Sequence, residues 1–144
     1  MINTKFNLPV MVSEWQVRFK PLPFMKKKGN RHYLATNLME TSTSFSNESL
    51  DQYKEQRYEY TLPVCTDYDI EEYGMDMLRN YYIHKKKSWS FPEIEKVDEY
   101  IVYLPYEIEE CDDKIFLIEN TTGLKKKIRS SDKIYETLKG DGYR

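Results

Sequence analysis

The chain has 144 residues, 40% of them hydrophobic and 15% aromatic, which favours one globular domain over residues 1–144 and excludes an intrinsically disordered chain. Its net charge of −2 is divided into alternating positive and negative blocks, which excludes a simple polyanion binder and a simple polyanion mimic. It has no run of about eighteen apolar residues and no basic flank before an apolar N-terminal stretch, so we expect a cytoplasmic protein without a membrane span.

The first predicted strand occupies the second half of residues 11–20, where apolar and polar residues alternate. Its inward side chains are Trp15, Val17 and Phe19. Prolines end this strand, and Lys26–Asn30 is predicted as an exposed turn in which Gly29 and Asn30 suit a positive φ. His32–Met39 is predicted as the returning strand.

The next part of the chain gives weaker signals. Residues 40–49 are short and polar and predict a mobile loop. Ser49–Tyr60 is compatible with a helix or a strand, and the alternation in Arg57–Leu62 favours a strand there. Pro63 would end that strand.

The strongest helical pattern runs from Thr66 to about His84. The apolar residues at helical spacing are Ile70, Tyr73, Met77, Leu78 and Tyr81. Thr66 or Asp67 is the expected N-cap, and acids near the start with bases near the end complement the helix dipole. Gly74 lowers helix propensity but permits close packing.

The C-terminal part predicts three strands between two short helices. Ser90–Val97 begins with a capping box and predicts a helix. The three strands, expected to form an antiparallel meander, are Tyr100–Leu104, Lys114–Glu119 and Leu124–Arg129. Pro105 should bend the first of them or place it at an edge.

The turn in this meander is Asn120–Gly123, and a last helix runs from the cap Ser131 to Leu138 before Gly140. The predicted class is therefore α+β. It comprises a twisted antiparallel sheet with the main helix packed on one face and a short C-terminal helix.

The charge blocks suggest a protein that steers toward a charged partner. The net charges are +6 over residues 1–36, −7 over 37–82, +3 over 83–89, −8 over 90–113 and +4 over 114–144. The main hypothesis is a non-enzymatic protein-binding modulator or accessory factor that presents an acidic, tyrosine-rich surface to a basic partner. The residues of this surface are Tyr68, Asp69, Glu72, Tyr73 and Asp76.

One alternative is a nucleic-acid-associated protein, because three Lys triplets could bind phosphates while an aromatic ring stacks on bases. Its candidate residues are Lys26, Lys27, Lys28, Lys85, Lys86, Lys87, Trp89, Lys125 and Lys127. Lys126 would face the other side of a strand. The plainer interpretation is that the triplets keep a turn, a helix end and an edge strand soluble. Another alternative is a structural subunit whose oppositely charged faces meet head to tail.

No catalytic, cofactor or metal site is predicted. Two histidines and two cysteines, Cys65 and Cys111, form no recognisable catalytic arrangement, and both cysteines are expected to be reduced and packed. The acids of Glu107–Asp113 predict a solvated hairpin rim more strongly than a cation site. Alanine occurs once, at Ala35, and this bias favours an AT-rich source such as a low-GC bacterium, or a phage or mobile element within one.

Overall fold

Six strands form one antiparallel sheet in the order β3-β2-β1-β4-β5-β6. The computed structural model describes residues 2–40, 42–46, 50–64 and 69–140. The elements are β1 (Ile2–Phe19), β2 (Lys28–Asn37), β3 (Ser42–Ser46), η1 (Asp51–Tyr53), α1 (Ile70–Asn80), η2 (Tyr81–Lys85), β4 (Glu93–Cys111), β5 (Lys114–Glu119), β6 (Leu124–Ile128) and α2 (Lys133–Gly140). The predicted α+β class is confirmed. Within the described ranges, no helix is long and apolar enough to cross a membrane.

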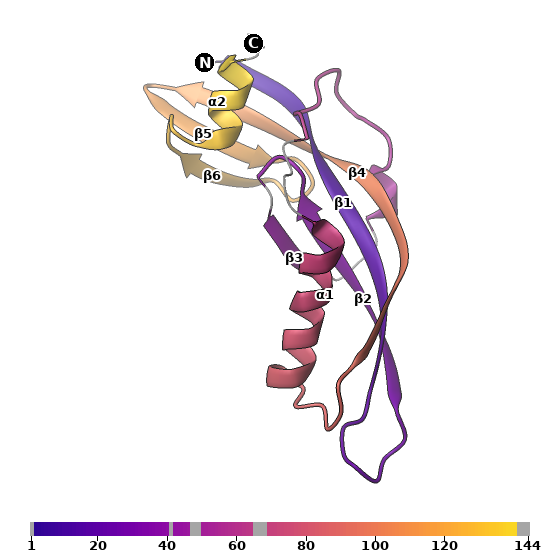
Figure 1. Cartoon of the computed structure of the whole chain (residues 1–144). Helices are drawn as coiled ribbons and strands as arrows, with labels where there is room; N and C mark the ends of the chain where they lie inside the picture. The colour runs from indigo at the N-terminus through magenta and orange to yellow at the C-terminus, as the bar shows by residue number, and fades with distance from the viewer. Residues whose placement is uncertain (1, 41, 47–49, 65–68, 141–144) are drawn as a thin grey trace.

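The two central strands, β1 and β4, run the length of the sheet, whereas the outer strands cover only one half each. β1 and β4 pair from Ile2 with Glu110 to Arg18 with Glu93. β2 pairs only with the second half of β1, and β5 only with the second half of β4. The molecule is therefore elongated, with α2, β5 and β6 at one end and the β1–β2 loop at the other (Figure 1).

The core is divided in the same way into two clusters. One extends from the middle of the sheet to α2, and its buried residues are Phe6, Leu8, Val10, Val12, Met39, Leu62, Val102, Ile108, Ile128, Ile134 and Leu138. The other lies under α1 and contains Trp15, Val17, Phe19, Leu34, Leu78 and Tyr82. Along β1 the buried apolar residues change from even to odd numbers beside a pairing irregularity between Glu14 and Trp15. The predicted inward residues of the first strand are confirmed.

The main helix packs against the sheet through a glycine. A Cβ placed on Gly74 would lie 3.1 Å from Leu34 Cδ1 and 3.1 Å from Trp15 Cζ2, so the close packing expected of this glycine is confirmed. The predicted apolar face is partly wrong. Leu78 is buried as predicted, but Tyr73 is exposed, and the buried Tyr82 was not part of the prediction. The first described helical residue is Ile70, and Asp69 is its N-cap rather than Thr66 or Asp67, which lie outside the described residues.

A non-strand segment covers the edge of β1 that β2 does not reach. The predicted strand at Arg57–Leu62 is wrong, since only Thr61 forms a bridge, which is parallel to Asn7. The Asn7 backbone N–H donates to Tyr60 C=O at 2.8 Å, and its C=O accepts from Leu62 N–H at 3.0 Å. The buried Asn7 side chain adds further hydrogen bonds to this segment, so one asparagine replaces part of a missing strand.

One predicted turn and one predicted loop in the first half of the chain are also partly wrong. Gly29 and Asn30 lie within β2, paired with Arg18 and Val17, and the loop precedes them. Pairing with the long β1 therefore extends the returning strand toward the loop. Residues 42–46 of the predicted loop form the edge strand β3, because they pair with residues 33–37 of β2, where the hydroxyls of Thr36 and Thr43 are also hydrogen-bonded. Residues 41 and 47–49 lie outside the described ranges.

The helix predicted at Ser90–Val97 is wrong, because β4 begins at Glu93 and pairs there with β1. The predicted meander is confirmed by β4, β5 and β6. Pro105 lies where β5 pairing has ended, so its missing N–H interrupts no strand pair on that side. The last helix is capped by Asp132, whose Oδ1 accepts from Ile134 N–H at 3.0 Å, and not by Ser131.

Candidate functional site

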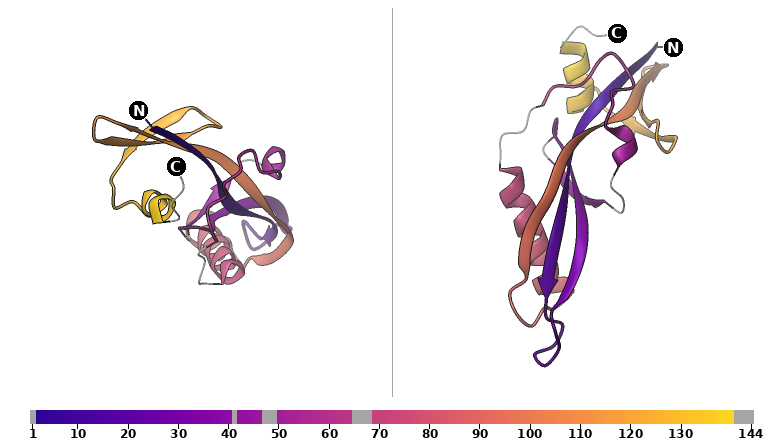
Figure 2. Two further views of the ribbon diagram at one scale, coloured as in Figure 1. Left: turned by 90° about the horizontal axis from the view of Figure 1, so that it is seen from above. Right: turned by 90° about the vertical axis from the view of Figure 1, so that its right-hand side faces the viewer.

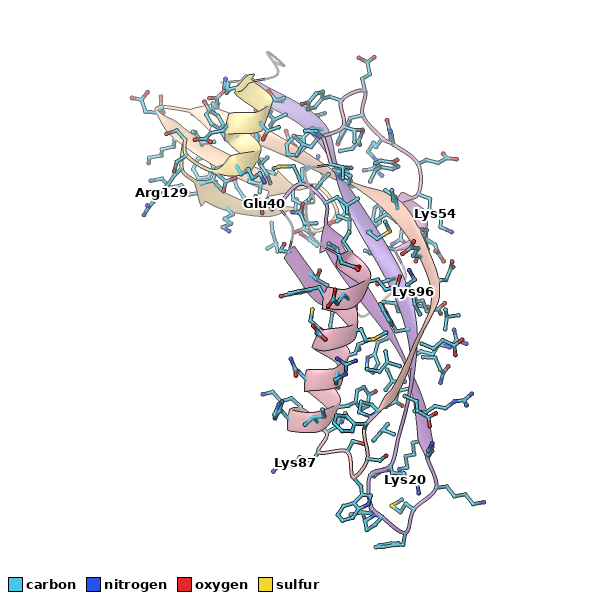
Figure 3. The ribbon with its side chains drawn as sticks, in the orientation of Figure 1. Lys20, Glu40, Lys54, Lys87, Lys96 and Arg129 are labelled. Atoms are coloured by element: carbon cyan, nitrogen blue, oxygen red, sulfur yellow. The ribbon has the colours of Figure 1, made fainter. Side chains whose placement is uncertain are left out.

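Two of the three Lys triplets lie at the same end of the molecule, although β2, β3 and α1 separate them in the sequence. Residues 20–28 contain the β1–β2 loop, and residues 85–91 lead from η2 into β4. We name these two segments together the basic tip. They contain seven lysines and no Asp or Glu. Figure 2 shows both loops at this end, and Figure 3 places Lys20 and Lys87 there.

Backbone hydrogen bonds and an ion pair fix the two segments of the basic tip. Trp89 N–H donates to Lys20 C=O at 2.7 Å, which joins one segment to the other. Ser88 N–H donates to the C=O of Tyr82 at 2.8 Å, and Lys27 pairs with Glu93 at the start of β4. Lys87 takes a left-handed φ of 50°. The rings and ammonium groups therefore project from an anchored backbone.

Large apolar side chains are exposed between these lysines. Phe24, Phe91 and Trp89 are 83%, 78% and 66% exposed, and Leu22 is exposed as well. Trp89 and Phe91 border a hollow of about 190 Å³ whose other lining residues are Ile83, Ser88 and Ser90. Such a group of exposed apolar side chains is a candidate interaction site, because apolar surface in water is unfavourable and large exposed patches are often covered by a partner.

Of these residues of the basic tip, Trp89 is predicted from the sequence, whereas Phe24, Phe91 and Lys20 are not. The prolines of the two loops could have predicted that the two phenylalanines are exposed. Phe24 follows Pro23, and Phe91 precedes Pro92. Proline disfavours helix and central-strand positions, where an apolar side chain would be buried. Apolar residues in loops rich in proline and lysine are therefore candidates for exposure.

A polar cluster supports the base of the basic tip. The buried Tyr82 hydroxyl accepts from Asn30 Nδ2 at 3.1 Å and is hydrogen-bonded to His32 Nε2. The His32 ring also meets the edges of Tyr81 and Phe45 at centroid distances of 5.9 and 5.8 Å. Tyr81 and Tyr82 belong to η2, a π-helical turn, a feature that is common at functional sites.

We expect this cluster to make stability depend on pH. Burial, with the charge of Lys86 nearby, lowers the pKa of His32 below 6.5. The unfolded chain therefore binds this proton more readily, and the free energy of unfolding should fall as the pH drops below about 6.5. Urea unfolding at pH 7.5 and 5.5 measures this fall, which His32→Gln should reduce. His84→Gln is the matched control, and an unchanged pH dependence in His32→Gln would contradict the prediction.

The third Lys triplet lies at the opposite end of the molecule and does not contribute to the basic tip. It forms most of β6, at the edge of the sheet near Arg129 (Figure 3). Lys125 pairs with Glu109 at 2.9 Å and lies over the ring of Phe116. Lys126 lines a different hollow with Leu117, so the triplet is divided between two faces, as alternation in a strand predicts.

The predicted acidic surface comes together on α1. Asp69, Glu72, Tyr73 and Asp76 line one shallow hollow of about 200 Å³, and Tyr68 lies outside the described residues. Two of these acids also serve the helix itself. Asp69 Oδ1 accepts from Glu72 N–H at 3.1 Å, and Asp76 pairs with Arg79 at 2.8 Å.

The acidic β4–β5 hairpin forms no metal cluster. Glu109 and Glu110 pair with Lys125 and Lys139, and the described part of the chain has no group of three His, Cys, Asp or Glu placed to hold a metal ion. A hollow of about 400 Å³ at this hairpin is bordered by Cys111, a half-buried residue that forms no disulfide and whose thiol donates to Asp112 Oδ2 at 3.7 Å. Cys65 lies outside the described residues.

Comparison of the chain with protein-family models, with curated proteins and with solved structures finds no match.

Proposed function

We propose that this protein binds nucleic acid without catalysing a reaction on it, and that the basic tip is its binding surface. The observation that carries this proposal is the meeting of two Lys triplets and exposed aromatic rings at one end of the fold. Lysines that neutralise phosphates supply most of the affinity of a nucleic-acid-binding protein, and aromatic side chains add stacking on bases. No Asp or Glu belongs to the basic tip, and at its border Glu93 pairs with Lys27.

Fluorescence anisotropy with short labelled DNA and RNA, at low and near-physiological salt, tests this proposal. Changing Lys85, Lys86 and Lys87 to Gln should weaken binding about tenfold or more and reduce the salt slope by about 2, because three phosphate contacts are lost. The matched control changes Lys125, Lys126 and Lys127 to Gln, which removes equal charge at the other end. No binding at low salt, or equal effects of the two triple variants, would contradict the proposal.

A second candidate function is binding of a basic protein partner by the acidic surface of α1. It is supported by the single hollow that four of the five predicted residues line. The basic tip of another copy is one such partner, and this pairing would make the protein a head-to-tail subunit. Light scattering at low salt should then show an average mass that grows with protein concentration. A triple variant with Asp69→Asn, Glu72→Gln and Asp76→Asn should keep a constant mass. A constant mass of the unaltered protein would exclude the head-to-tail form.

A further inference from the structure

We infer that the basic tip selects single-stranded over double-stranded nucleic acid, with one base entering the hollow beside Trp89 and Phe91. This inference rests on the proposed function and adds the strand state of the ligand. In a duplex the faces of the bases are stacked inside the helix. A protein surface that does not enter a groove therefore contacts mainly the phosphates. Only an unpaired base offers a ring face on which an aromatic side chain can stack.

The two rings are held ready for such a base. The backbone of Trp89 is hydrogen-bonded to Lys20, the residue after β1, and the Ser88 hydroxyl donates to Ser90 C=O at 2.6 Å. The rings themselves are mostly exposed. An anchored backbone lowers the entropy lost when a ligand orders the site, so the exposed rings form a prepared surface and not a loose loop.

The charges around the hollow fit the backbone of a strand. Lys85, Lys86 and Lys87 directly precede Ser88, which lines the hollow, and they are exposed. Lys20, in the other segment of the tip, accepts the backbone N–H of Trp89 on its C=O. Lysines of both segments are therefore near neighbours of Trp89, and their charge suits the phosphates before and after a stacked base.

The hollow also favours a nucleic acid over a lipid surface. Exposed apolar side chains among lysines are found on proteins that enter an anionic bilayer. Insertion into a bilayer, however, would use the rings as separate apolar anchors, whereas a planar base can stack on a ring beside the shallow hollow that Trp89 and Phe91 border. Anionic vesicles therefore belong in the test as the competing ligand.

The experiment compares labelled dT20 with the dA20·dT20 duplex by anisotropy at near-physiological salt. We expect the single strand to bind about tenfold tighter or more, and Trp89→Ala to weaken its binding about fivefold or more while changing duplex binding less than about twofold. Trp89→Phe should retain most of the affinity, whereas Trp89→Leu, which keeps bulk without a ring, should not. Quenching of Trp89 fluorescence by dT20 is a second readout, since Trp15 is buried.

The outcomes separate the inference from the function on which it rests. Equal affinity for the two DNAs, or equal loss for both in Trp89→Ala, would overturn single-strand selection and leave nucleic-acid binding in place. No binding of either DNA at low salt would overturn both. Binding to vesicles of phosphatidylserine and phosphatidylcholine, retained in Trp89→Leu and without binding of dT20, would also overturn both and assign the basic tip to a lipid surface.

Discussion

Replacing Trp15 with alanine is expected to lower the free energy of unfolding by about 3–5 kcal/mol, the usual loss when a large aromatic side chain is removed from a core. Trp15 is 1% exposed and lies directly beneath Gly74 of α1. Its Nε1–H donates to Ser13 Oγ at 2.8 Å, so the substitution also removes one of two hydrogen bonds of a buried hydroxyl, the other being donated to Leu34 C=O. The cavity would open between the helix and the sheet.

Chemical unfolding followed by circular dichroism measures the effect of Trp15→Ala. The same substitution at the exposed Trp89 is a matched control, and it should change stability by no more than about 0.5 kcal/mol. A loss below about 1 kcal/mol for Trp15→Ala, well under the usual range for a core aromatic, would mean that α1 does not depend on this contact.

Replacing Asn7 with leucine should destabilise the protein by about 2–4 kcal/mol, because buried polar groups that lose their partners each cost about 1–3 kcal/mol. The Asn7 amide donates to Tyr58 C=O at 2.7 Å and to Thr61 Oγ1 at 3.1 Å. Its Oδ1 accepts from the N–H groups of Arg57 and Tyr58 at 3.2 and 3.1 Å. A leucine would fill similar space and satisfy none of these groups.

Hydrogen exchange at Arg57 and Tyr58 reports this change directly, alongside the unfolding free energy. Both amides should lose protection in Asn7→Leu. Asn3→Leu, an exposed position on the same strand, is the matched control and should leave them protected. Equal behaviour of the two variants would show that the segment is held by other contacts.

Local sequence patterns predicted the elements in which the residues of the element itself determine its structure. Alternation located the inward side chains Trp15, Val17 and Phe19 of β1, and β5 has the predicted bounds Lys114–Glu119. The turn after β5 followed from Gly123, which takes a positive φ of 77°. In these elements the alternation of apolar residues and the turn residues favour the same structure. A short window of sequence is therefore sufficient to predict them.

Contacts distant in sequence decided the elements that were missed. Asn7 and Pro9 obscure the alternation of the first half of β1. Asn7 is buried and hydrogen-bonded to Tyr60 and Leu62, in a segment that no local pattern relates to it. The start of β4 has a capping box that favours a helix, but pairing of Glu93 with Arg18 of the central strand overrides it. The lysines of the basic tip were visible in the sequence, but their meeting depends on where α1 ends relative to the β1–β2 loop.

The length of the two central strands also determines the order in which the protein can fold. β1 can pair with β2 soon after both are synthesised, but its other edge must wait for β4, and Ile2 must finally meet Glu110. Closing such long loops gives slow folding, on a timescale of milliseconds to seconds for sheets dominated by distant pairs. Until then the long edge of β1 is open to strands of other chains. Once folding is complete, the outermost strands are the short polar β3 and the lysine-rich β6, neither of which readily accepts another strand.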